Sequence, residues 1–502
     1  MIAVLLFVAA VLCYISFRFK RRRLYELAAL IPEAPMPIPF IGALQYTISF
    51  EDPSFNMMNL IKLFSTFAVK QGGLIKLWAG PILFVGITDP TDLEFVLRKC
   101  LEKSNVLWLL QTVIGNAGIF APVSIWVRRR KLTVPAFSPR IINSYIDVLI
   151  EKSENLAQSF SVENLVGTGT FKAWSHVSSY TLDTIFETAL GITDNGSNPE
   201  RKKFLEESTK LLALITHRGL RVWLWPDFIY KWTKDYSQFI KSRKFTYEFT
   251  DKIIQRKRKE LENVEIEDAH LQNGVSKTVR CFLDNLILLS RAEQITDTEL
   301  REEVLTFLFG GTDTSSVSIC NTLKLLAKYP KVQEKLYDEL MEVLGDPKRT
   351  ITKDDLPQLK YLERVLKESL RLFPPAPITL RKVHEETELP SGKILPTGSH
   401  IFIGVWAASR DPKFWGRDAD CFDPDRFLPE RQVGLFIPFS CGPRNCIGTQ
   451  FAYMSIKLAL TAILRRYRIT GEEESGPVPH MDCSFNIMMK ARDDYEIGLE
   501  MR

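Results

Sequence analysis

The clearest feature of the hydropathy pattern lies at the N-terminus, where residues 2–17 are apolar apart from Ser16 and the basic run 18–23 follows at once. A cleaved signal peptide has the opposite order, with charges before its apolar core and a small-residue cleavage site after it. The observed order therefore predicts one N-terminal transmembrane anchor, residues 1–20, with a stop-transfer signal after it. The stretch is near the short limit for spanning a bilayer, so we expect little tilt and basic side chains that reach the interface.

Residues 21–45 contain the basic run and then closely spaced prolines, from Pro32 to Pro39. Proline prevents helix formation and favours stiff, extended backbone. We therefore expect a linker here and one large domain after it, residues 46–502, because no low-complexity segment or internal repeat follows. The alternative, a proline-rich ligand for another protein, is disfavoured because the segment is short and interleaved with apolar residues.

Beyond the linker the pattern changes along the chain. Two short apolar runs, 74–78 and 82–85, are joined by Ala-Gly-Pro and predict a β-hairpin. Helical periodicity dominates from residue 140 to 345, with a charged and mobile stretch expected near 255–278. The apolar run 400–405 predicts a further strand. The chain is therefore expected to be mainly α-helical with small β-sheets.

Composition and charge narrow the class of protein. The 502 residues are 45% hydrophobic and 25% charged, which is typical of a globular protein with a large core. A net charge of +5 is slight for this length and disfavours nucleic acid as a partner. The positive-inside rule places everything after Arg18 in the cytosol, so the eight cysteines should be reduced and the sequon at Asn195 unglycosylated.

The most specific chemical signal is the run 439–448, which has the form F-x-x-G-x-R-x-C-x-G. A lone cysteine is usually a buried apolar residue, but five fixed positions in ten residues favour a thiolate ligand for haem iron at Cys446. Gly442 and Gly448 would let the backbone approach a flat macrocycle, and a helix that begins after Cys446 would aim N–H groups at its sulfur. Arg444 is placed to pair with a haem propionate.

This run closely resembles the haem-binding loop of the cytochromes P450, and the resemblance covers essentially the whole chain. It implies the cytochrome P450 fold in a single catalytic domain, with Phe439, Arg444, Cys446 and Gly448 as cofactor-binding residues. Cys441 stands where the family commonly has a small residue, and we interpret it as a packing residue.

A second group of candidates lies in the run 303–316, an apolar helix interrupted by Gly310 and Gly311 and by the acid–alcohol pair Asp313 and Thr314. Glycine in a helix interior costs about 1 kcal/mol relative to alanine, which is explained if a ligand must approach the backbone closely. A kinked helix with a C-cap is the alternative. The run resembles the central oxygen-activating helix of the family, in which Thr314 would hydrogen-bond dioxygen and Asp313 would relay protons inward.

Glu368 and Arg371 are spaced i, i+3 on one predicted helix face. Such pairs are common on exposed helices and contribute little, so the pair alone carries no functional signal. The pair precedes the run 422–427 and then the cysteine loop, which is the order found in the family. The resemblance therefore implies a buried structural network of Glu368, Arg371 and Arg426 behind the haem.

The run 126–137 resembles the family's W-x-x-x-R helix, which implies that Trp126 and Arg130 reach a haem propionate. Arg381 resembles a further propionate contact. A basic run is usually a solvated helix face. In this chain such a face would also suit an acidic electron donor, with candidate contacts Arg128, Arg129 and Lys131.

Motifs at 182–191 and 223–227 resemble the animal family-4 branch, and the central run resembles insect microsomal members of it. That branch is known for oxidising fatty acids and other long aliphatic chains. Gly310 stands where many members carry a Glu that esterifies the haem, Leu305 where Asp is usual and Thr312 where His is common. We therefore expect haem b bound noncovalently apart from the Cys446 iron ligand, with open space above it.

The resemblance implies a monooxygenase in the endoplasmic reticulum membrane that hydroxylates or epoxidises long-chain fatty acids, hydrocarbons or xenobiotics. Its electrons would come from NADPH through a flavin reductase, with cytochrome b5 as a further candidate donor. A reductase-independent peroxide isomerase is the first alternative, but Thr314 disfavours it because such an enzyme needs no proton delivery to dioxygen. A noncatalytic haem-based binding protein is the second, which the retained Asp313 and Thr314 disfavour.

Overall fold

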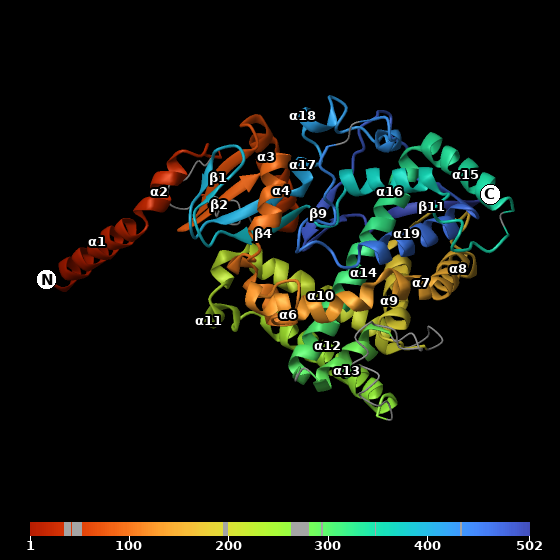
Figure 1. Cartoon of the computed structure of the whole chain (residues 1–502), viewed down its shortest axis with the longest axis horizontal. Helices are drawn as coiled ribbons and strands as arrows, with labels where there is room; N and C mark the ends of the chain where they lie inside the picture. Colours follow the sequence, from red (N-terminus) through yellow and green to blue (C-terminus); the bar gives the residue numbers. More distant parts are fainter. Residues whose placement is uncertain are drawn as a thin grey trace.

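The computed structural model describes residues 1–34, 42, 53–193, 199–262, 281–292, 295–346, 348–431 and 434–502. The sequon at Asn195, most of the proline-rich segment and most of the stretch predicted to be mobile lie outside these residues. Among the described residues, one helix is long and apolar enough to cross a membrane: α1 (Ile2–Lys20). It projects from the body of the protein, and α2 (Arg22–Ala29) connects the two (Figure 1).

The body consists of helices with four small sheets. Its helices are α3 (Pro53–Lys70), α4 (Pro90–Lys99), α5 (Trp108–Ile114), α6 (Val123–Thr133), α7 (Pro139–Ser144), α8 (Ile146–Val162), α9 (Trp174–Thr188), α10 (Pro199–Leu220), α11 (Asp227–Tyr230), α12 (Lys234–Glu260), α13 (Phe282–Ala292), α14 (Asp297–Lys328), α15 (Pro330–Leu344), α16 (Lys360–Leu372), α17 (Val405–Ala408), α18 (Pro412–Trp415) and α19 (Thr449–Leu464). Its strands are β1 (Leu74–Ala79), β2 (Ile82–Ile87), β3 (Thr170–Lys172), β4 (Ile378–Lys382), β5 (Thr387–Glu388), β6 (Ile394–Leu395), β7 (His400–Gly404), β8 (Tyr467–Thr470), β9 (Cys483–Asn486), β10 (Met488–Ala491) and β11 (Glu496–Met501).

The largest sheet has the strand order β1-β2-β7-β4. The predicted hairpin is confirmed, because β1 and β2 pair antiparallel. The strand predicted at 400–405 is present as β7, although Val405 already begins α17. Since β4 pairs antiparallel with β7, Arg381 lies opposite Ile401 on the edge strand of this sheet.

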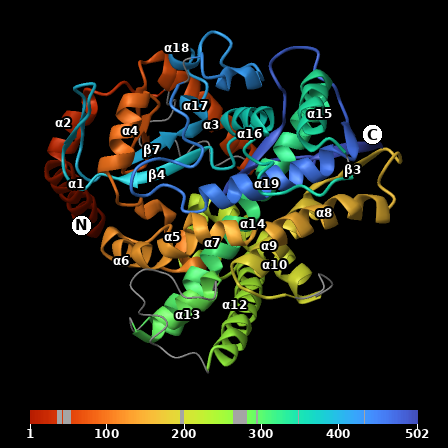
Figure 2. The same cartoon turned by 45° about the vertical axis from the view of Figure 1, so that its right-hand side comes forward.

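Helix α14 forms the centre of the helical part and lies between α19 and the pair α12 and α13 (Figures 1 and 2). Thr296 and Glu299 form a capping box at its start, and Pro330, which begins the next helix, follows its end. Apolar side chains such as Leu308 and Leu323 are fully buried against the neighbouring helices. Over the described part of residues 140–345 the predicted helical character is confirmed, with the short strand β3 as an exception that pairs with the C-terminal strand β11.

Two large apolar clusters hold the body together, and a small third one around Ile75 joins α3 to β1. The larger of the two joins the helices around α14, and the smaller of the two packs α2 and α4 against the four-stranded sheet. The cysteine loop, residues 439–448, runs between these two clusters into α19. The fold therefore brings the loop, the central helix and the sheet residue Arg381 to one place.

Candidate active site

A cavity of about 370 Å³ lies between the cysteine loop and α14. Its wall is mainly apolar and includes aromatic side chains from α6, α13, α14 and α19 and from the loop. The predicted residues that line it are Trp126, Arg130, Gly310, Gly311, Thr314, Arg381, Phe439, Arg444, Cys446 and Gly448. Residues separated by more than 300 positions in the sequence thus meet around one space.

The cysteine loop is a tight turn held by the backbone. The Cys446 N–H donates to the Phe439 carbonyl at 2.9 Å, and Gly442 has a positive φ of 73°. A Cβ at Gly442 would lie 2.8 Å from the carbonyl oxygen of Leu97 in α4. Gly442 does not line the cavity in the described residues, so its glycine is required by the turn and by packing on α4, and the predicted approach to a macrocycle is wrong for this residue.

Cys446 is exposed and lines the cavity. The surrounding protein groups keep much of the solvent away from the sulfur, and this desolvation raises the pKa of the thiol. The Gly448 N–H and the Thr449 side chain lower that pKa. Helix α19 begins at Thr449, as the sequence predicts. Two donors at a helix start therefore point at the sulfur and favour its thiolate form, which is the form that binds iron.

Four cationic side chains line the cavity without a carboxylate partner: none of Lys103, Arg130, Arg381 and Arg444 has a carboxylate oxygen within 4.0 Å among the described residues. Arg381 is 1% exposed, its closest acceptors are the Thr379 hydroxyl at 3.4 Å and a backbone carbonyl at 3.3 Å, and its Nε has no partner. Burial lowers the pKa of Arg381 to about 10.

Arg444 shows the same imbalance. It donates to the backbone carbonyls of Leu101, Gly118 and Ala121, which are neutral acceptors, and its guanidinium lies over the Trp126 ring at 4.2 Å. Burial, with the charge of Arg381 nearby, lowers the pKa of Arg444 to about 10. A buried cation without an anion is unfavourable, so this part of the cavity fits a ligand that brings negative charge.

Lys103 is the cation that sequence analysis missed. Its backbone bridges to that of Arg381, and burial together with the charges of Arg381 and Arg444 lowers its pKa well below the usual range. The Lys103 ammonium lies 6.0 Å from the centre of the Phe120 ring and within 3.5 Å of the Thr379 hydroxyl. No motif surrounds this lysine in the sequence, so only the fold could reveal it.

These groups fit a haem, which has two propionate carboxylates and an iron that takes an axial thiolate. Cys446 would supply the thiolate, and the unpaired cations would hold the propionates. Arg130 is partly engaged already, because it donates to the Asn445 carbonyl at 3.0 Å and to the Asn445 Oδ1 at 2.8 Å, which ties α6 to the cysteine loop.

The glycine pair on α14 lines the cavity, but the helix runs through it without interruption. A Cβ at Gly311 would lie 2.6 Å from Cδ1 of Ile185 in α9, whereas a Cβ at Gly310 would meet nothing closer than Ile119 at 3.8 Å. Thr314 donates its hydroxyl hydrogen to the Gly310 carbonyl at 2.6 Å. Gly311 is therefore required by helix packing, and Gly310 leaves space toward the cavity.

Asp313 does not reach the cavity in this structure. Its carboxylate pairs with the Lys490 ammonium of β10 at 3.1 Å, and it is absent from the cavity wall formed by the described residues. Lys490, a largely buried cation from a distant strand, attracts the Asp313 carboxylate. Relay of protons by Asp313 stays a prediction.

The structure brings Glu368, Arg371 and Arg426 together as a buried network. Glu368 accepts two hydrogen bonds from Arg371, at 2.6 and 2.7 Å, and one from Arg426 at 3.3 Å. The remaining donors of both arginines reach backbone carbonyls or Asp418. Cys441, which we interpret as a packing residue, is partly buried against the smaller apolar cluster.

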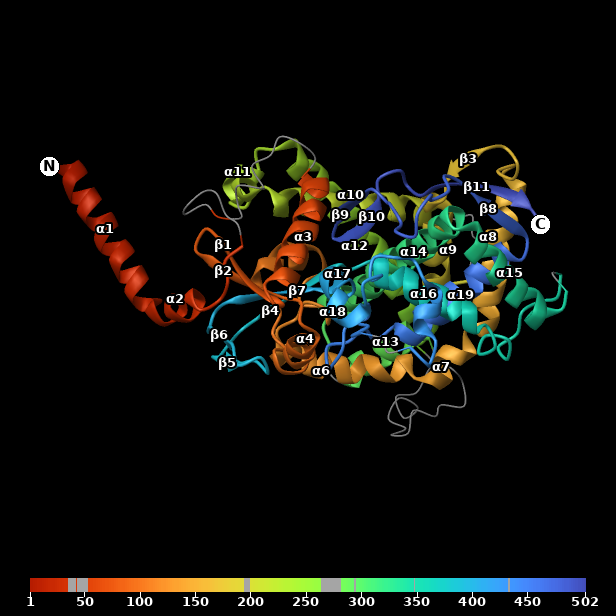
Figure 3. The same ribbon diagram turned by 90° about the horizontal axis from the view of Figure 1, so that it is seen from above.

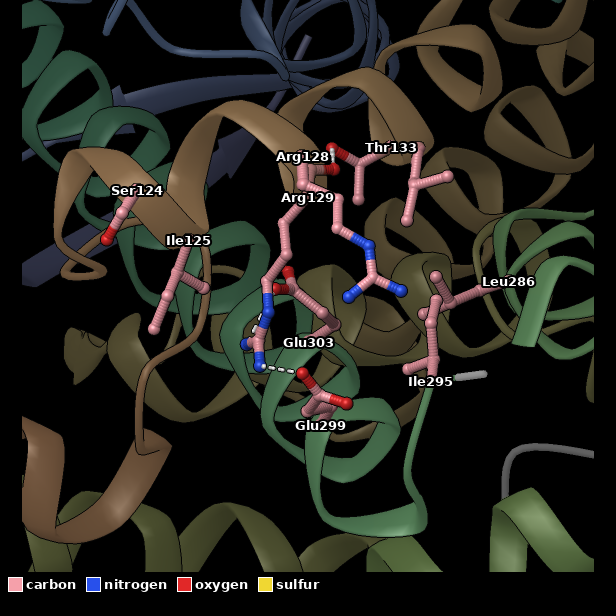
Figure 4. A pocket seen from close by; sticks show the side chains of 10 residues that line it. Ser124, Ile125, Arg128, Arg129, Thr133, Leu286, Ile295, Glu299 and Glu303 are labelled. Carbon is pink, nitrogen blue, oxygen red and sulfur yellow. Dashed lines mark hydrogen bonds and ion pairs between the residues drawn. The ribbon is translucent and has the colours of Figure 1, made fainter. Parts of the chain in front are cut away.

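The basic run on α6 divides between surface and interior. Arg128 and Lys131 are exposed, which is compatible with a docking face. Arg129 is buried and pairs with Glu299, Glu302 and Glu303 of α14, each at 3.1 Å; Figure 4 shows it reaching from α6 to two of them. The predicted surface role of Arg129 is therefore wrong, because three carboxylates on another helix draw its side chain inward.

Known proteins resemble this chain over most of its length. The sequence model of the family described as Cytochrome P450 matches residues 32–495. Cytochrome P450 4c3 of Drosophila melanogaster is 32% identical over 93% of this chain and 89% of its own length. Cytochrome P450 4c21 of Blattella germanica is 33% identical over 93% and 92%, and human Cytochrome P450 4V2 is 32% identical over 80% and 78%.

Proposed function

The chain belongs to the cytochrome P450 family and is a haem-thiolate monooxygenase, and from that premise we propose that it oxidises long-chain fatty acids or hydrocarbons with electrons from NADPH. Small xenobiotics are a second substrate class that the apolar wall would also admit. The observation that carries the proposal is a cysteine sulfur and a threonine hydroxyl that line one mainly apolar cavity.

When bound, the haem supplies activation of dioxygen and cleavage of the O–O bond, in the overall reaction RH + O2 + 2e⁻ + 2H⁺ → ROH + H2O. Cys446 would hold the iron, and Arg381, Arg444 and Lys103 would neutralise the propionates. Thr314 lines the same cavity, where its hydroxyl can donate a hydrogen bond once its bond to the Gly310 carbonyl is released. The aromatic wall excludes bulk water and favours an apolar substrate.

We propose that the cofactor is haem b without a covalent link to α14. Gly310 has no side chain that could esterify a haem methyl group, and a Cβ there would have only Ile119 within 4 Å. The space above Gly310 also suits a kinked chain or an oxidation site inside an aliphatic chain.

P450 enzymes use redox partners, and we propose an NADPH-dependent flavin reductase as the donor, with cytochrome b5 as a second one. Exposed Arg128 and Lys131 on α6 lie next to Arg130, which contacts the cysteine loop through Asn445. A positive face at this position would attract an acidic donor to the side of the protein closest to Cys446.

We propose an endoplasmic reticulum location with the catalytic domain in the cytosol. Helix α1 is followed by basic residues, and the side chains of Phe228 and Trp232 are 71% and 91% exposed. Helix α11, which carries Phe228, lies toward the end of the molecule from which α1 projects (Figures 1 and 3). A bilayer that holds α1 could therefore also cover these aromatic side chains.

The test is NADPH-dependent oxygen uptake by the holoenzyme with a microsomal flavin reductase and a panel of fatty acids, hydrocarbons and xenobiotics. We expect uptake that rises with aliphatic substrates and products that carry one new oxygen atom, whose position is mapped for each substrate. Turnover of organic peroxides without reductase, combined with no oxygen uptake, would instead support the isomerase. Binding of apolar ligands without any turnover would support the noncatalytic alternative.

A further inference from the structure

The proposed reaction consumes two protons in a buried cavity, and this inference rests on that proposed function. Because the wall of the cavity is mainly apolar, we expect a titratable side chain to transfer these protons into it. Asp313, the predicted relay, is paired with Lys490 and does not line the cavity in this structure. A titratable group that does line the cavity is therefore a candidate for a further entry of protons.

Glu303 is the only carboxylate among the described residues that line the cavity. It lies on the same face of α14 as Thr306, Gly310 and Thr314, which follow at i+3, i+7 and i+11 and also line the cavity. With a rise of about 1.5 Å per residue, Glu303 is about 16 Å from Thr314 along the helix. One helix face thus connects an acidic side chain to the predicted oxygen-binding threonine.

A second cleft, of about 140 Å³, lies on the other side of Glu303, between α6, α13 and the start of α14. Exposed Ser124 and Arg128 are among the side chains that line it, as Figure 4 shows. Glu303 and Thr133 line both this cleft and the haem cavity. The two spaces therefore share a wall in which Glu303 is the only acidic residue.

The charges around Glu303 favour an extra proton. Arg129 faces three carboxylates, Glu299, Glu302 and Glu303, so full ionisation would leave an excess of two negative charges. Burial raises the pKa of Glu303, against the opposing effect of Arg129 and of the Gly118 N–H, which donates to Glu303 at 3.1 Å. The pKa of Glu299 is lowered.

Apart from Glu299, the other charged side chains that line the two spaces are cations. The remaining acids of these helices have partners, since Asp284 of α13 pairs with Lys257 and Asp297 of α14 pairs with Arg258. Arg128 of α6 lines the outer cleft, and Arg130 lines the haem cavity. On the cavity side, Gly118 links Arg444 to Glu303: Arg444 donates to the Gly118 carbonyl, and the Gly118 N–H donates to Glu303. The lining residue from α13 in the outer cleft, Leu286, is apolar.

We propose that Glu303 is the proton inlet of the haem cavity: it takes a proton from water in the outer cleft and passes it to water in the cavity, toward Thr314. Arg129 is a positioning residue that holds the carboxylate between the two spaces. The inlet differs from the acid–alcohol pair because it enters the cavity from the start of α14, beside α6.

The test compares Glu303→Gln with Glu302→Gln in the reconstituted holoenzyme. Both variants remove one carboxylate from Arg129, but Glu302 does not line the haem cavity. Glu303→Gln should raise the share of NADPH electrons recovered as hydrogen peroxide by about threefold or more and should raise the solvent isotope effect on NADPH oxidation. Glu303→Asp should restore part of the loss, and Glu302→Gln should stay close to the unmodified protein.

Equal behaviour of Glu303→Gln and Glu302→Gln would overturn the inference, provided that both retain haem. Infrared spectroscopy of the resting holoprotein gives a readout independent of turnover. We expect a carboxyl band that shifts with pH, exchanges rapidly in D2O and disappears in Glu303→Gln only. Absence of that band would also overturn the inlet, whereas its presence in an enzyme without NADPH turnover would support the inlet and contradict the proposed function.

Discussion

Two groups of buried arginines in this protein have opposite surroundings. Arg371 and Arg426 share the carboxylate of Glu368, and their other donors reach carbonyls or Asp418. Arg381 and Arg444 are buried to a similar degree, at 1% and 8% exposure, yet they have only neutral acceptors. The first group is complete within the chain, and the second is complete only when an anionic ligand is bound.

The difference separates structure from binding. A buried guanidinium that pairs with a carboxylate supports the fold. An unpaired buried guanidinium is unfavourable in the empty protein, and an anionic ligand can offset this cost. Because an unpaired buried cation is unfavourable, its presence in the cavity that Cys446 lines is a signal of a cofactor site.

Removal of the shared carboxylate should have the largest effect. Glu368→Gln leaves the buried Arg371 guanidinium without its anion and leaves Arg426 with Asp418 alone, and it should lower the free energy of unfolding by about 3–5 kcal/mol. The measurement is denaturant unfolding of the holoprotein, with soluble yield as a second readout. Glu94→Gln, in the exposed pair with Arg98, is the control and should cost less than about 1 kcal/mol. A Glu368→Gln protein as stable as the control would show that the network is not structural.

His400 differs from both groups of arginines, because this buried side chain can become neutral by losing its proton. His400 is 8% exposed, its Nδ1 lies 2.7 Å from the neutral Ser104 hydroxyl, and burial lowers its pKa to about 4. As the pH falls, His400 binds its proton in the unfolded chain near pH 6.5, before it does so in the folded protein. Its contribution to the free energy of unfolding should therefore be fully present above pH 6.5 and should fall by up to about 3 kcal/mol as the pH drops toward 4.

The check is the free energy of unfolding measured between pH 7 and 4. His400→Gln should flatten that part of the profile, and His384→Gln, at an exposed position, is the control. An unchanged slope in His400→Gln would mean that other groups cause the loss at low pH.

Replacement of an unpaired arginine should weaken cofactor binding without harming the empty protein. Arg381→Met removes a charge-assisted contact to a propionate, so haem transfer to excess apomyoglobin should be about tenfold faster or more. Unfolding of the haem-free protein should be unchanged or need more denaturant. Arg98→Met is a control on the surface. Arg381→Met could instead destabilise the haem-free protein as much as Glu368→Gln destabilises the holoprotein. In that case the unpaired arginines would support the fold in the same way as the paired ones.

Gly310 and Gly311 of α14 allow a comparison of the cavity side of this helix with its packed side, with the smallest expected effect. Gly311→Ala must displace Ile185 and should lower stability by about 1 kcal/mol, because overpacking exceeds the gain in helix propensity. Gly310→Ala has room and should raise stability by up to about 1 kcal/mol. Melting temperatures of the two holoproteins give the signs. Equal signs would show that the cavity side of α14 is as tightly packed as the side that faces α9.

Local sequence was sufficient where a feature depends on neighbouring residues. The hairpin of β1 and β2 follows from two apolar runs around Gly80 and Pro81, and the cysteine loop follows from fixed spacing. The Glu368 network required the order of motifs along the chain, because Arg426 is 58 residues from Glu368. These features could be recognised because their partners are marked by motifs.

The features that sequence analysis missed depend on partners without a motif. Arg129 is buried by carboxylates about 170 residues away, and Asp313 is held by Lys490, 177 residues further on. A basic run looks the same whether it faces water or an acidic helix. In the same way, nothing around Lys103 indicates that two buried arginines lie beside it.

The most direct test of the central claim is the absorption spectrum of the reduced carbonyl complex. The unmodified protein should show the long-wavelength Soret band of thiolate-ligated haem, and Cys441→Ser, in the same loop, should keep it. Cys446→Ser should lose that band because the only candidate thiolate that lines the described cavity is removed. Retention of the thiolate-type band in Cys446→Ser would contradict the assignment of this cysteine as the iron ligand.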